Sequence, residues 1–383
     1  MRFEALIEQT LSELRSGQLL REPDDGAARR AVVEDARAAG LTPIDASSND
    51  YLGLASDSVS RETPAHAGAA ASRLIHGTTP EHVELESELA QWVGAESALL
   101  FSSTYAANLG LISALGVAGT VVLSDASNHA SLIDGSRLAK AEVRVIPHLN
   151  LEALEEQLHA HRTARAVWVA TESYFSMDGD GPDLEALRVL CDRHDACLIV
   201  DEAHALGVFG AGGGGRCAET GVRPDILVGA LGKAVGSHGG FVAGSTALRR
   251  FLWNKARSFV FSTALSPRHT ALTTRQVRLT RSADAQRTQL RNNVANLRRA
   301  LTDSNVPLAP HSFGPIVSVV LGGSERALRV AATLRGQGIL AQAIRAPTVP
   351  ADAARLRLTV KATFSADEIS RLARAVVDAC RAS

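Results

Sequence analysis

Two short apolar runs that end in chemically reactive residues constrain the fold of this chain more than any other feature. The first run, ACLIV at 196–200, leads into Asp201 and His204, and the second, ILVGAL at 226–231, leads to Lys233. Each run has the length and continuous apolarity of a buried parallel strand. Because ligands of open α/β sheets bind outside the carboxyl ends of the strands, all three side chains are expected to face one crevice.

From residue 97 onward, strand-like and helix-like segments alternate along the chain. This alternation is typical of a mostly parallel central sheet with helices on both faces, so an α/β fold is predicted. The strands are expected at 97–101, 120–124, 143–146, 166–171, 197–200, 226–228 and 240–243. The helices are expected at 105–115, 131–138, 151–159, 184–193 and 247–256.

The chain is predicted to have three parts. Helical periodicity at 3–21 and the Arg-rich sequence after it predict an N-terminal helix and arm, residues 1–45. Residues 46–280 are the predicted large domain, and a long polar helix at 267–302 is expected to connect it to residues 281–383. The latter are predicted to be a smaller C-terminal α+β domain. Its strands are expected near 316–321 and 356–360, and its helices near 325–336 and 366–380.

Charge and cysteine content narrow the possible partners and compartment. The net charge is −1, which gives no electrostatic footprint for nucleic acid or an anionic membrane, so a small-molecule partner is expected. The four cysteines show no C-x-x-C pair, and no metal site is predicted. The N-terminus lacks the apolar core of a signal peptide, and no run is long enough to span a membrane. A cytoplasmic protein is therefore expected.

Lysine is scarce in this chain, and that makes Lys233 notable. Lysine and arginine together number 40, yet the only lysines are Lys140, Lys233, Lys255 and Lys361. Lysine can lose its proton and form an imine with an aldehyde, whereas arginine cannot. Lys233 follows a predicted strand and lies among glycines that permit close approach of a ligand. Schiff-base chemistry is thus favoured over a solvated loop lysine.

Nucleotide hydrolysis was considered because the letters DEAH at 201–204 also occur in helicases. That chemistry needs a phosphate loop of the form G-x-x-x-x-G-K-[ST]. Here Lys233 is followed by Ala234, and the residue five before Gly232 is Leu227, so the loop is missing. The glycine-rich segment 210–215 fits G-x-G-x-x-G by letters, but no apolar strand precedes it, so a flexible loop is predicted there.

Other polar residues follow predicted strands and join the same crevice. A strand-end aspartate is often only a turn or helix-cap residue, but Asp201 can also hold a protonated ring nitrogen, with His204 near a ring hydroxyl. His129 follows strand 120–124 and can stack on a flat ring, and Ser176 follows strand 166–171. The loop at 102–105 precedes a helix whose first amides can bind phosphate. Together these residues suit pyridoxal phosphate.

At these residues the chain resembles the α-oxoamine synthases, pyridoxal phosphate enzymes of the fold-type I (aspartate aminotransferase-like) superfamily. The resemblance runs through ordered motifs along most of the chain. The matching segments are SNDYLGLA at 48–55, SRLIHGTTPEHVELE at 72–86, ALLFSSTYAANLG at 98–110, NHASLIDGSRL at 128–138, ESYFSMDGD at 172–180, DEAHALG at 201–207, GKAVG at 232–236, FSTALSP at 261–267, IRAPTVP at 344–350 and RLRLT at 355–359.

The resemblance implies roles for individual residues around the cofactor. Lys233 is implied to bind the cofactor aldehyde, Asp201 to hold the pyridine nitrogen, His204 the ring hydroxyl, and His129 to stack on the ring. Further cofactor contacts are implied for Ser176, for the backbone amides of Thr104 and Tyr105, and, across the interface of a homodimer with shared active sites, for Ser262 and Thr263.

The resemblance also implies the substrates. The family joins an amino acid to an acyl-CoA or acyl-carrier-protein thioester and releases carbon dioxide. Asn49, Thr348 and Arg357 match substrate-contacting positions, with Arg357 expected to bind the amino-acid carboxylate, and Arg21 matches an acyl-substrate contact. His129 is expected to contact substrate as well as cofactor, by polarising the thioester carbonyl. The SRL segment follows the members that use L-alanine.

Several alternatives stay open at this point. Another amino acid (glycine or serine) or acyl group, a transaminase on the same fold, and a non-catalytic binding protein are each compatible with parts of the pattern. Two positions depart from the family: Ala230 stands where a threonine or serine is usual, and Thr104 where a glycine is usual.

Overall fold

The computed structural model describes residues 12–17, 27–56, 66–346, 348–350 and 352–383. Contacts divide the chain into two compact units. The first contains 1–49, 177–179 and 290–383, and the second contains 50–176 and 180–289. The N-terminal and C-terminal segments thus share one unit, where the sequence predicted an arm and a separate small domain. The predicted helix at 3–21 lies largely outside the described residues, with 12–16 helical.

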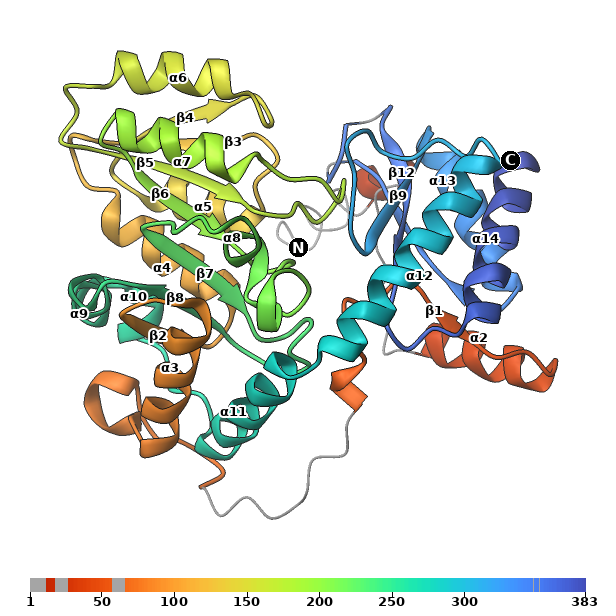
Figure 1. Ribbon diagram of the computed structural model, residues 1–383, viewed down its shortest axis with the longest axis horizontal. Helices are drawn as coiled ribbons and strands as arrows, with labels where there is room; N and C mark the ends of the chain where they lie inside the picture. The colour runs from red at the N-terminus through yellow and green to blue at the C-terminus, as the bar shows by residue number, and fades with distance from the viewer. Residues whose placement is uncertain (1–11, 18–26, 57–65, 347, 351) are drawn as a thin grey trace. The chain divides into compact units, whose positions relative to one another are not determined.

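The second unit is built on a seven-stranded sheet in the order β2-β8-β7-β6-β5-β3-β4 (Figure 1). Strand β8 runs antiparallel to both of its neighbours, and all other pairs are parallel. The prediction of a mostly parallel sheet is confirmed. The strands are β2 (Ser97–Phe101), β3 (Thr120–Asp125), β4 (Glu142–Ile146), β5 (Ala166–Glu172), β6 (Cys197–Asp201), β7 (Ile226–Ala230) and β8 (Gly240–Gly244).

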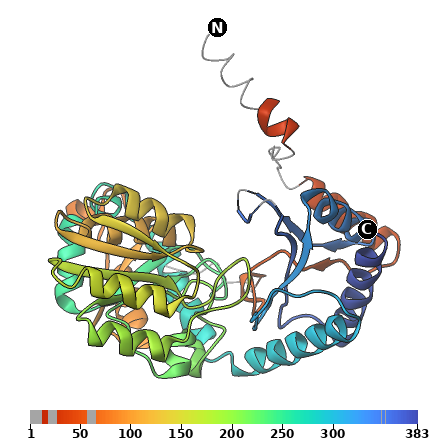
Figure 2. The ribbon, with the colours of Figure 1, turned by 90° about the horizontal axis from the view of Figure 1, so that it is seen from above.

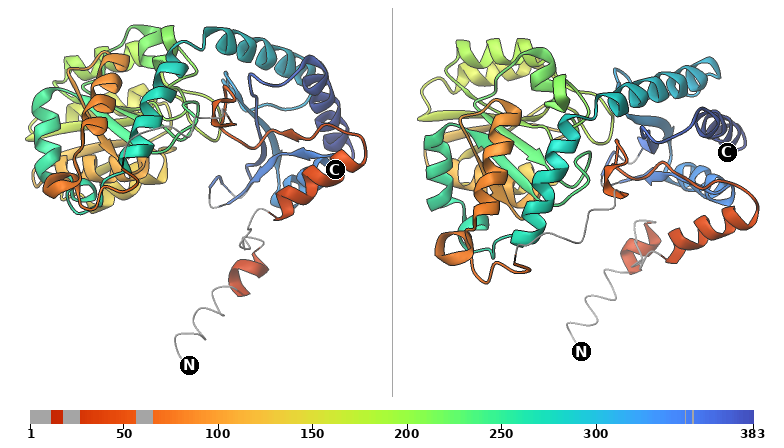
Figure 3. Two further views of the ribbon diagram at one scale, coloured as in Figure 1. Left: turned by 90° about the horizontal axis from the view of Figure 1, so that it is seen from below. Right: turned by 60° about the horizontal axis from the view of Figure 1, so that its bottom comes forward.

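Helices cover both faces of this sheet (Figures 2 and 3). Side chains alternate between faces along each strand, so Ile199 packs toward one set of helices while Leu198 and Val200 pack toward the other. The first face carries α4 (Thr104–Leu115), α5 (Ala130–Leu138), α9 (Thr246–Lys255) and α10 (Arg257–Val260). The second carries α3 (Pro80–Val93), α6 (Leu151–Ala160), α7 (Leu184–Arg193), α8 (Gly215–Thr220) and α11 (Pro267–Arg281).

The prediction of one long connector helix at 267–302 is wrong, because the chain forms two helices there. Helix α11 ends at Arg281, and α12 (Asp284–Asp303) begins after a two-residue interruption. The guanidinium of Arg287, 1% exposed, donates hydrogen bonds to the carbonyls of Thr280 and Arg281 at 2.7 and 3.0 Å. Those carbonyls lie in the last turn of α11, where intrahelical partners run out, so Arg287 stabilises the break.

The glycine-rich segment 210–215 is also ordered, against the prediction of a flexible loop. It contains a short 3-10 turn, η3 (Ala211–Gly213), and leads into α8. The buried carboxylate of Glu202 accepts the first amides of α8, from Arg216 at 2.9 Å and Cys217 at 2.7 Å. A Cβ on Gly215 would lie 2.4 Å from that carboxylate, so the position requires glycine.

The first unit contains an antiparallel sheet in the order β11-β12-β9 and a parallel pair, β1 with β10. The predicted strands at 316–321 and 356–360 correspond to β9 and β12. Among the described residues of the whole chain, no helix has both the length and the apolarity to cross a bilayer. The elements of this unit are α2 (Ala27–Ala38), β1 (Ile44–Asp45), β9 (Ile316–Gly322), α13 (Ser324–Gly336), β10 (Ile339–Leu340), β11 (Gln342–Ile344), β12 (Ala354–Thr359) and α14 (Ala366–Arg381).

Candidate functional site

Strands β2, β3, β5, β6 and β7 run in one direction, so their carboxyl ends share one edge of the sheet. The residues that follow the carboxyl ends of these strands include the candidate site residues that the sequence predicts for this unit. Hydrogen bonds join several of them, as described below. The edge therefore gathers an imidazole, an amine and buried carboxylates, the combination that the crevice was predicted to hold.

Asp201 ends β6 and is only 3% exposed. Its Oδ1 accepts the amide of Ala203 at 2.8 Å, and its Oδ2 accepts the side-chain amide of Asn108 at 2.7 Å. N–H donors of this kind stabilise the charged form of a carboxylate. Asp201 is therefore a turn residue, and it is also a fixed negative group at this edge of the sheet.

His129 caps the start of α5 and is linked to Asp201 through two further side chains. Its Nδ1 lies 2.8 Å from Oγ of Ser131, and Asn108 donates to that same oxygen at 2.9 Å. Burial lowers the pKa of His129, and the nearby positive charge of Lys233 lowers it further, while the charge of Asp201 opposes both. Asn108 was not among the predicted site residues, although a polar residue among apolar ones in a predicted helix is a signal for such a role.

His204 is held by a contact from a distant part of the chain. Its Nδ1 lies 2.8 Å from the hydroxyl of Tyr51, and both residues are buried. Tyr51 belongs to the SNDYLGLA segment, one of the motifs of the family resemblance, and no role was predicted for it. The hydroxyl fixes the orientation of the imidazole ring. The tautomer of the ring then determines whether the other nitrogen, Nε2, donates or accepts a hydrogen bond.

Lys233 lies in the tight connection between β7 and β8 and is half-buried. The amide of Gly236 donates to the Lys233 carbonyl at 2.9 Å, and Gly236 has a φ of 68°. A Cβ on Gly236 would lie 2.6 Å from the amide nitrogen of Ala55, so the turn requires glycine. Lys233 follows β7, one of the strands whose carboxyl ends share this edge.

Thr104 and Tyr105 open α4, whose N-cap is Ser103. The helix start lies against β8 so closely that a Cβ on Gly240 would be 2.4 Å from the Thr104 nitrogen. The Thr104 hydroxyl donates to the Gly229 carbonyl at 3.4 Å, next to Ala230. Tyr105 is 43% exposed and donates to Asp134. Both amides thus stand at the N-terminus of a twelve-residue helix, where phosphate binds favourably.

The other predicted cofactor contacts of this unit lie on loops. Ser176 occupies a turn after β5 and is half-buried. Ser262 and Thr263 follow α10, and Thr263 forms an antiparallel bridge with Ser72. They border a small hollow shared with Ser102.

The other predicted substrate residues that the structure describes, Asn49, Thr348 and Arg357, belong to the first unit. Arg357, on β12, is 4% exposed and donates to Oδ1 of Asn49 at 3.0 Å and to the Thr359 hydroxyl at 3.1 Å. The amide of Thr348 donates to the Arg345 carbonyl at 3.0 Å. Arg21 lies outside the described residues. Asn49 and Arg357, two of the predicted substrate residues, are thus brought together.

A charged cluster that sequence reasoning missed fixes two loops behind this edge. His148 lies 2.8 Å from Asp125, through Nδ1, and 3.2 Å from Asp180, through Nε2. The ring of Phe175 packs edge-on at a centroid distance of 4.5 Å. Burial disfavours the charged imidazole, but the hydrogen bonds to the two carboxylates outweigh burial and raise the pKa of His148 to about 10.

Replacing His148 with glutamine is expected to lower stability most at acidic and neutral pH. The raised pKa means that the imidazolium contributes fully below the unfolded pKa of about 6.5 and loses its contribution as pH rises through about 10. Calorimetry from pH 6 to 10 should show a deficit of about 2 kcal/mol at pH 6 that shrinks toward pH 10. His159→Gln, at an exposed position, is the control, and a pH-independent deficit would contradict the assignment.

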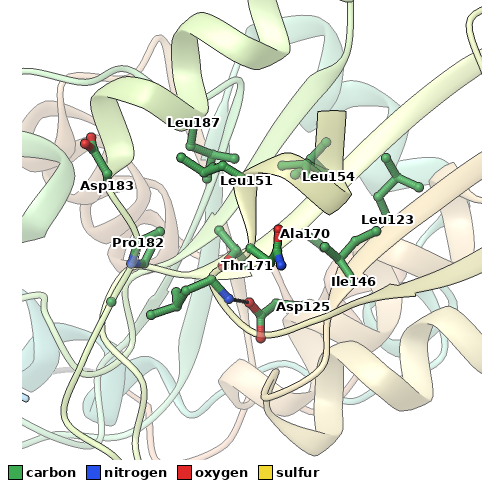
Figure 4. Close-up of a pocket in the computed structure, with 14 residues that line it drawn as sticks. Leu123, Asp125, Ile146, Leu151, Leu154, Ala170, Thr171, Pro182, Asp183 and Leu187 are labelled. Atoms are coloured by element: carbon green, nitrogen blue, oxygen red, sulfur yellow. Dashed lines mark hydrogen bonds between the residues drawn. The ribbon is translucent and has the colours of Figure 1, made fainter. Parts of the chain in front are cut away.

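A separate apolar cavity of about 120 Å³ lies between β3, β5, α6 and α7 (Figure 4). Half of the residues that line it are leucine, isoleucine or valine, and Asp125 accepts the Leu149 amide at its edge. None of the predicted site residues lines it. The part of the chain that the structure describes also contains no group of three or more His, Cys, Asp or Glu side chains able to hold a metal ion.

The donor set at the strand ends fits pyridoxal phosphate. A protonated pyridine nitrogen needs a buried carboxylate, which Asp201 supplies, and the aldehyde needs an amine, which Lys233 supplies. The start of α4 suits the phosphate. The polar atoms of Asp201 accept only N–H donors among the hydrogen bonds described, which is the chemistry expected of a partner for a cationic ring.

Comparisons with known proteins found matches along most of the chain. Residues 42–376 match the model of aminotransferase class I and II. The chain is 42% identical to an 8-amino-7-oxononanoate synthase of Alkalilimnicola ehrlichii, over 88% of each chain, and 41% identical to one of Acidithiobacillus ferrooxidans, over 95% of each. A serine palmitoyltransferase from S. paucimobilis with bound PLP-myriocin aldimine has a TM-score of 0.85 at 27% identity, covering 93% of this chain and 98% of that one.

Proposed function

The chain belongs to the class I and II aminotransferase family and, within it, to the α-oxoamine synthases, and on that premise we propose that it is an 8-amino-7-oxononanoate synthase. The reaction joins L-alanine to pimeloyl-CoA or a pimeloyl-carrier protein and yields 8-amino-7-oxononanoate, carbon dioxide and the free thiol, in biotin biosynthesis. The observation that carries the proposal is identity of about 40% over most of the chain to relatives of that name, together with Asp201 and Lys233 at one sheet edge.

Pyridoxal phosphate supplies an electron sink that stabilises negative charge at the α-carbon of the amino acid. In the proposal, Lys233 binds the cofactor aldehyde and then carries the α-proton on its amine. Asp201 keeps the ring nitrogen protonated, His204 contacts the ring hydroxyl and His129 stacks on the ring. The amides of Thr104 and Tyr105 hold the phosphate, with Ser176 as a further contact.

The substrate contacts and the assembly are part of the same proposal. Arg357 pairs with the carboxylate of the amino acid, supported by Asn49, because a buried guanidinium already oriented by an amide oxygen binds a carboxylate in a fixed geometry. Thr348 and Arg21 are assigned to substrate by the family resemblance alone. Two copies of the chain share their active sites, with Ser262 and Thr263 serving the partner. The four cysteines are free thiols, which suits a cytoplasmic location.

A matrix of amino acids against acyl thioesters tests this function through release of free thiol. We expect release only when both substrates are present, with L-alanine and pimeloyl thioester giving the highest kcat/KM. Running each thioester as the CoA and the carrier-protein form identifies the carrier. Keto-acid exchange without thiol release would instead identify a transaminase.

Serine is the second candidate amino acid, because serine palmitoyltransferases are close structural neighbours of this chain. The same matrix decides between the two. A preference for serine with a long-chain thioester would replace the alanine assignment while keeping the reaction type.

A further inference from the structure

Glu172 lies beside Asp201, one strand away, and has no role in the function proposed so far. It is the last residue of β5, and its Cα partner across the parallel ladder is Asp201. Residues in register on parallel strands project to the same face of the sheet, here the face that α4 and α5 cover. Each residue is 3% exposed. Two carboxyl groups are therefore buried side by side at the cofactor edge.

The two carboxyl groups accept different hydrogen bonds, and this difference decides which of them keeps a proton. Asp201 accepts two N–H donors, from Asn108 and Ala203. Glu172 accepts the backbone amide of His129 through Oε1 at 2.6 Å. Two carboxyl groups this close do not both ionise readily, so Glu172, which accepts fewer N–H donors, is the one that keeps a proton.

The charged groups around Glu172 agree with this division. Burial raises the pKa of Glu172 to about 8, and the charges of Asp201 on β6 and of Asp125 on β3 act in the same direction. Lys233, after β7, and the hydrogen bond from the His129 amide at the start of α5 lower it. The position is thus balanced so that one added positive charge next to Asp201 changes the protonation of Glu172.

Resting on the proposed function, we infer that Glu172 is a positioning residue that holds a proton in the cofactor-free protein and releases it to solvent when a protonated pyridine ring pairs with Asp201. The ring nitrogen neutralises Asp201 and removes the repulsion that kept Glu172 protonated. Only the O–H bond of Glu172 breaks, and its proton goes to water. The carboxylate that results accepts the His129 amide more strongly and so fixes the residue that stacks on the ring.

This exchange makes cofactor affinity depend on pH with a definite sign. The bound form carries fewer protons than the free form, so the Kd for pyridoxal 5'-phosphate falls as pH rises toward about 8. The contribution of Glu172 is at most about tenfold per pH unit, because one proton is released. Above about pH 8, Glu172 is ionised in both forms and its contribution ends.

The test measures the Kd of the full-length protein for pyridoxal 5'-phosphate from pH 6 to 9 in three proteins. Other groups of cofactor and protein also titrate, but they are common to all three. Below pH 8, Glu172 is expected to change the Kd of the wild type by up to tenfold per pH unit, and Glu172→Gln is expected to lack this contribution. Glu202→Gln is the matched control: that carboxyl is equally buried, next to Asp201 in the chain, but accepts amides of Arg216 and Cys217 on the opposite face.

A measurement on the wild type alone covers the case in which Glu172→Gln does not fold. Infrared difference spectra of protein labelled with ¹³C-glutamate should show a protonated carboxyl band that disappears on binding pyridoxal 5'-phosphate. Parallel pH slopes in wild type and Glu172→Gln, or a band that persists, would overturn the role of Glu172 and leave the cofactor assignment standing. A wild type that binds no cofactor at any pH overturns both.

Discussion

Lys233→Ala protein is expected to show no visible absorption from lysine-bound cofactor and to release thiol more than about 10³-fold more slowly than wild type. Lys233 is the lysine at the shared edge of the sheet, and its charge already acts on His129 and Glu172. Its loss removes both the amine that forms the imine and the group that carries the α-proton. Absorption spectra and the thiol-release assay check the two effects separately.

Two further variants show whether the amine itself is needed. Lys233→Arg keeps a positive charge but cannot form an imine, so it should lose the visible band as completely as Lys233→Ala. Lys255→Ala removes an exposed lysine at the end of α9 and should leave band and rate unchanged. A visible band that survives in Lys233→Ala would place the imine on another lysine and refute the assignment.

The residues at strand ends could be predicted from sequence because buried strands have a local signature. An apolar run of five or six residues followed by a charged residue locates Asp201 and Lys233 without knowledge of the fold. Once the alternation of strands and helices predicts a parallel sheet, the shared edge follows from topology. The same argument extends to Glu172, which also ends an apolar strand. Glu172 was therefore predictable as a residue of this edge, although it was not among the predicted site residues.

The contacts that orient these residues were not predictable in the same way. Asn108 and Asp201 are 93 residues apart, and Tyr51 and His204 are 153 apart, so only the folded chain pairs them. The break between α11 and α12 depends on where Arg287 reaches, which periodicity does not encode. Helix α3 did have a local signal, a threonine N-cap followed by proline, that was left unassigned.

The free edge of the central sheet carries the second large prediction. Strand β2 is one of the two edge strands of this sheet, and unpaired backbone groups on such an edge invite pairing with other chains. Here the Glu86 carboxylate accepts the Leu100 amide at 3.0 Å, and the Arg249 Nε donates to the Ala98 carbonyl at 3.1 Å. Side chains therefore occupy hydrogen-bonding groups of β2 that a neighbouring strand would otherwise use.

Glu86 also forms ion pairs with two arginines beside β2. Its Oε1 lies 2.9 Å from Arg73, and its Oε2 lies 2.9 Å from Arg249. Arg73 and Glu86 are each 4% exposed, so both charges are largely removed from water. Both guanidinium groups also lie near the ring of Trp253. Removal of the carboxylate leaves buried positive charge and a buried amide without their partner.

Glu86→Ala is therefore expected to lower the free energy of unfolding by about 3–5 kcal/mol, the cost of breaking a buried pair from one side. Chemical denaturation measures it, and light scattering should show concentration-dependent association through the uncovered edge. Glu84→Ala, on the same helix but paired with Arg278 at an exposed position, should cost less than about 1 kcal/mol. Equal losses in the two variants would show that the edge contacts contribute nothing beyond an ordinary surface pair.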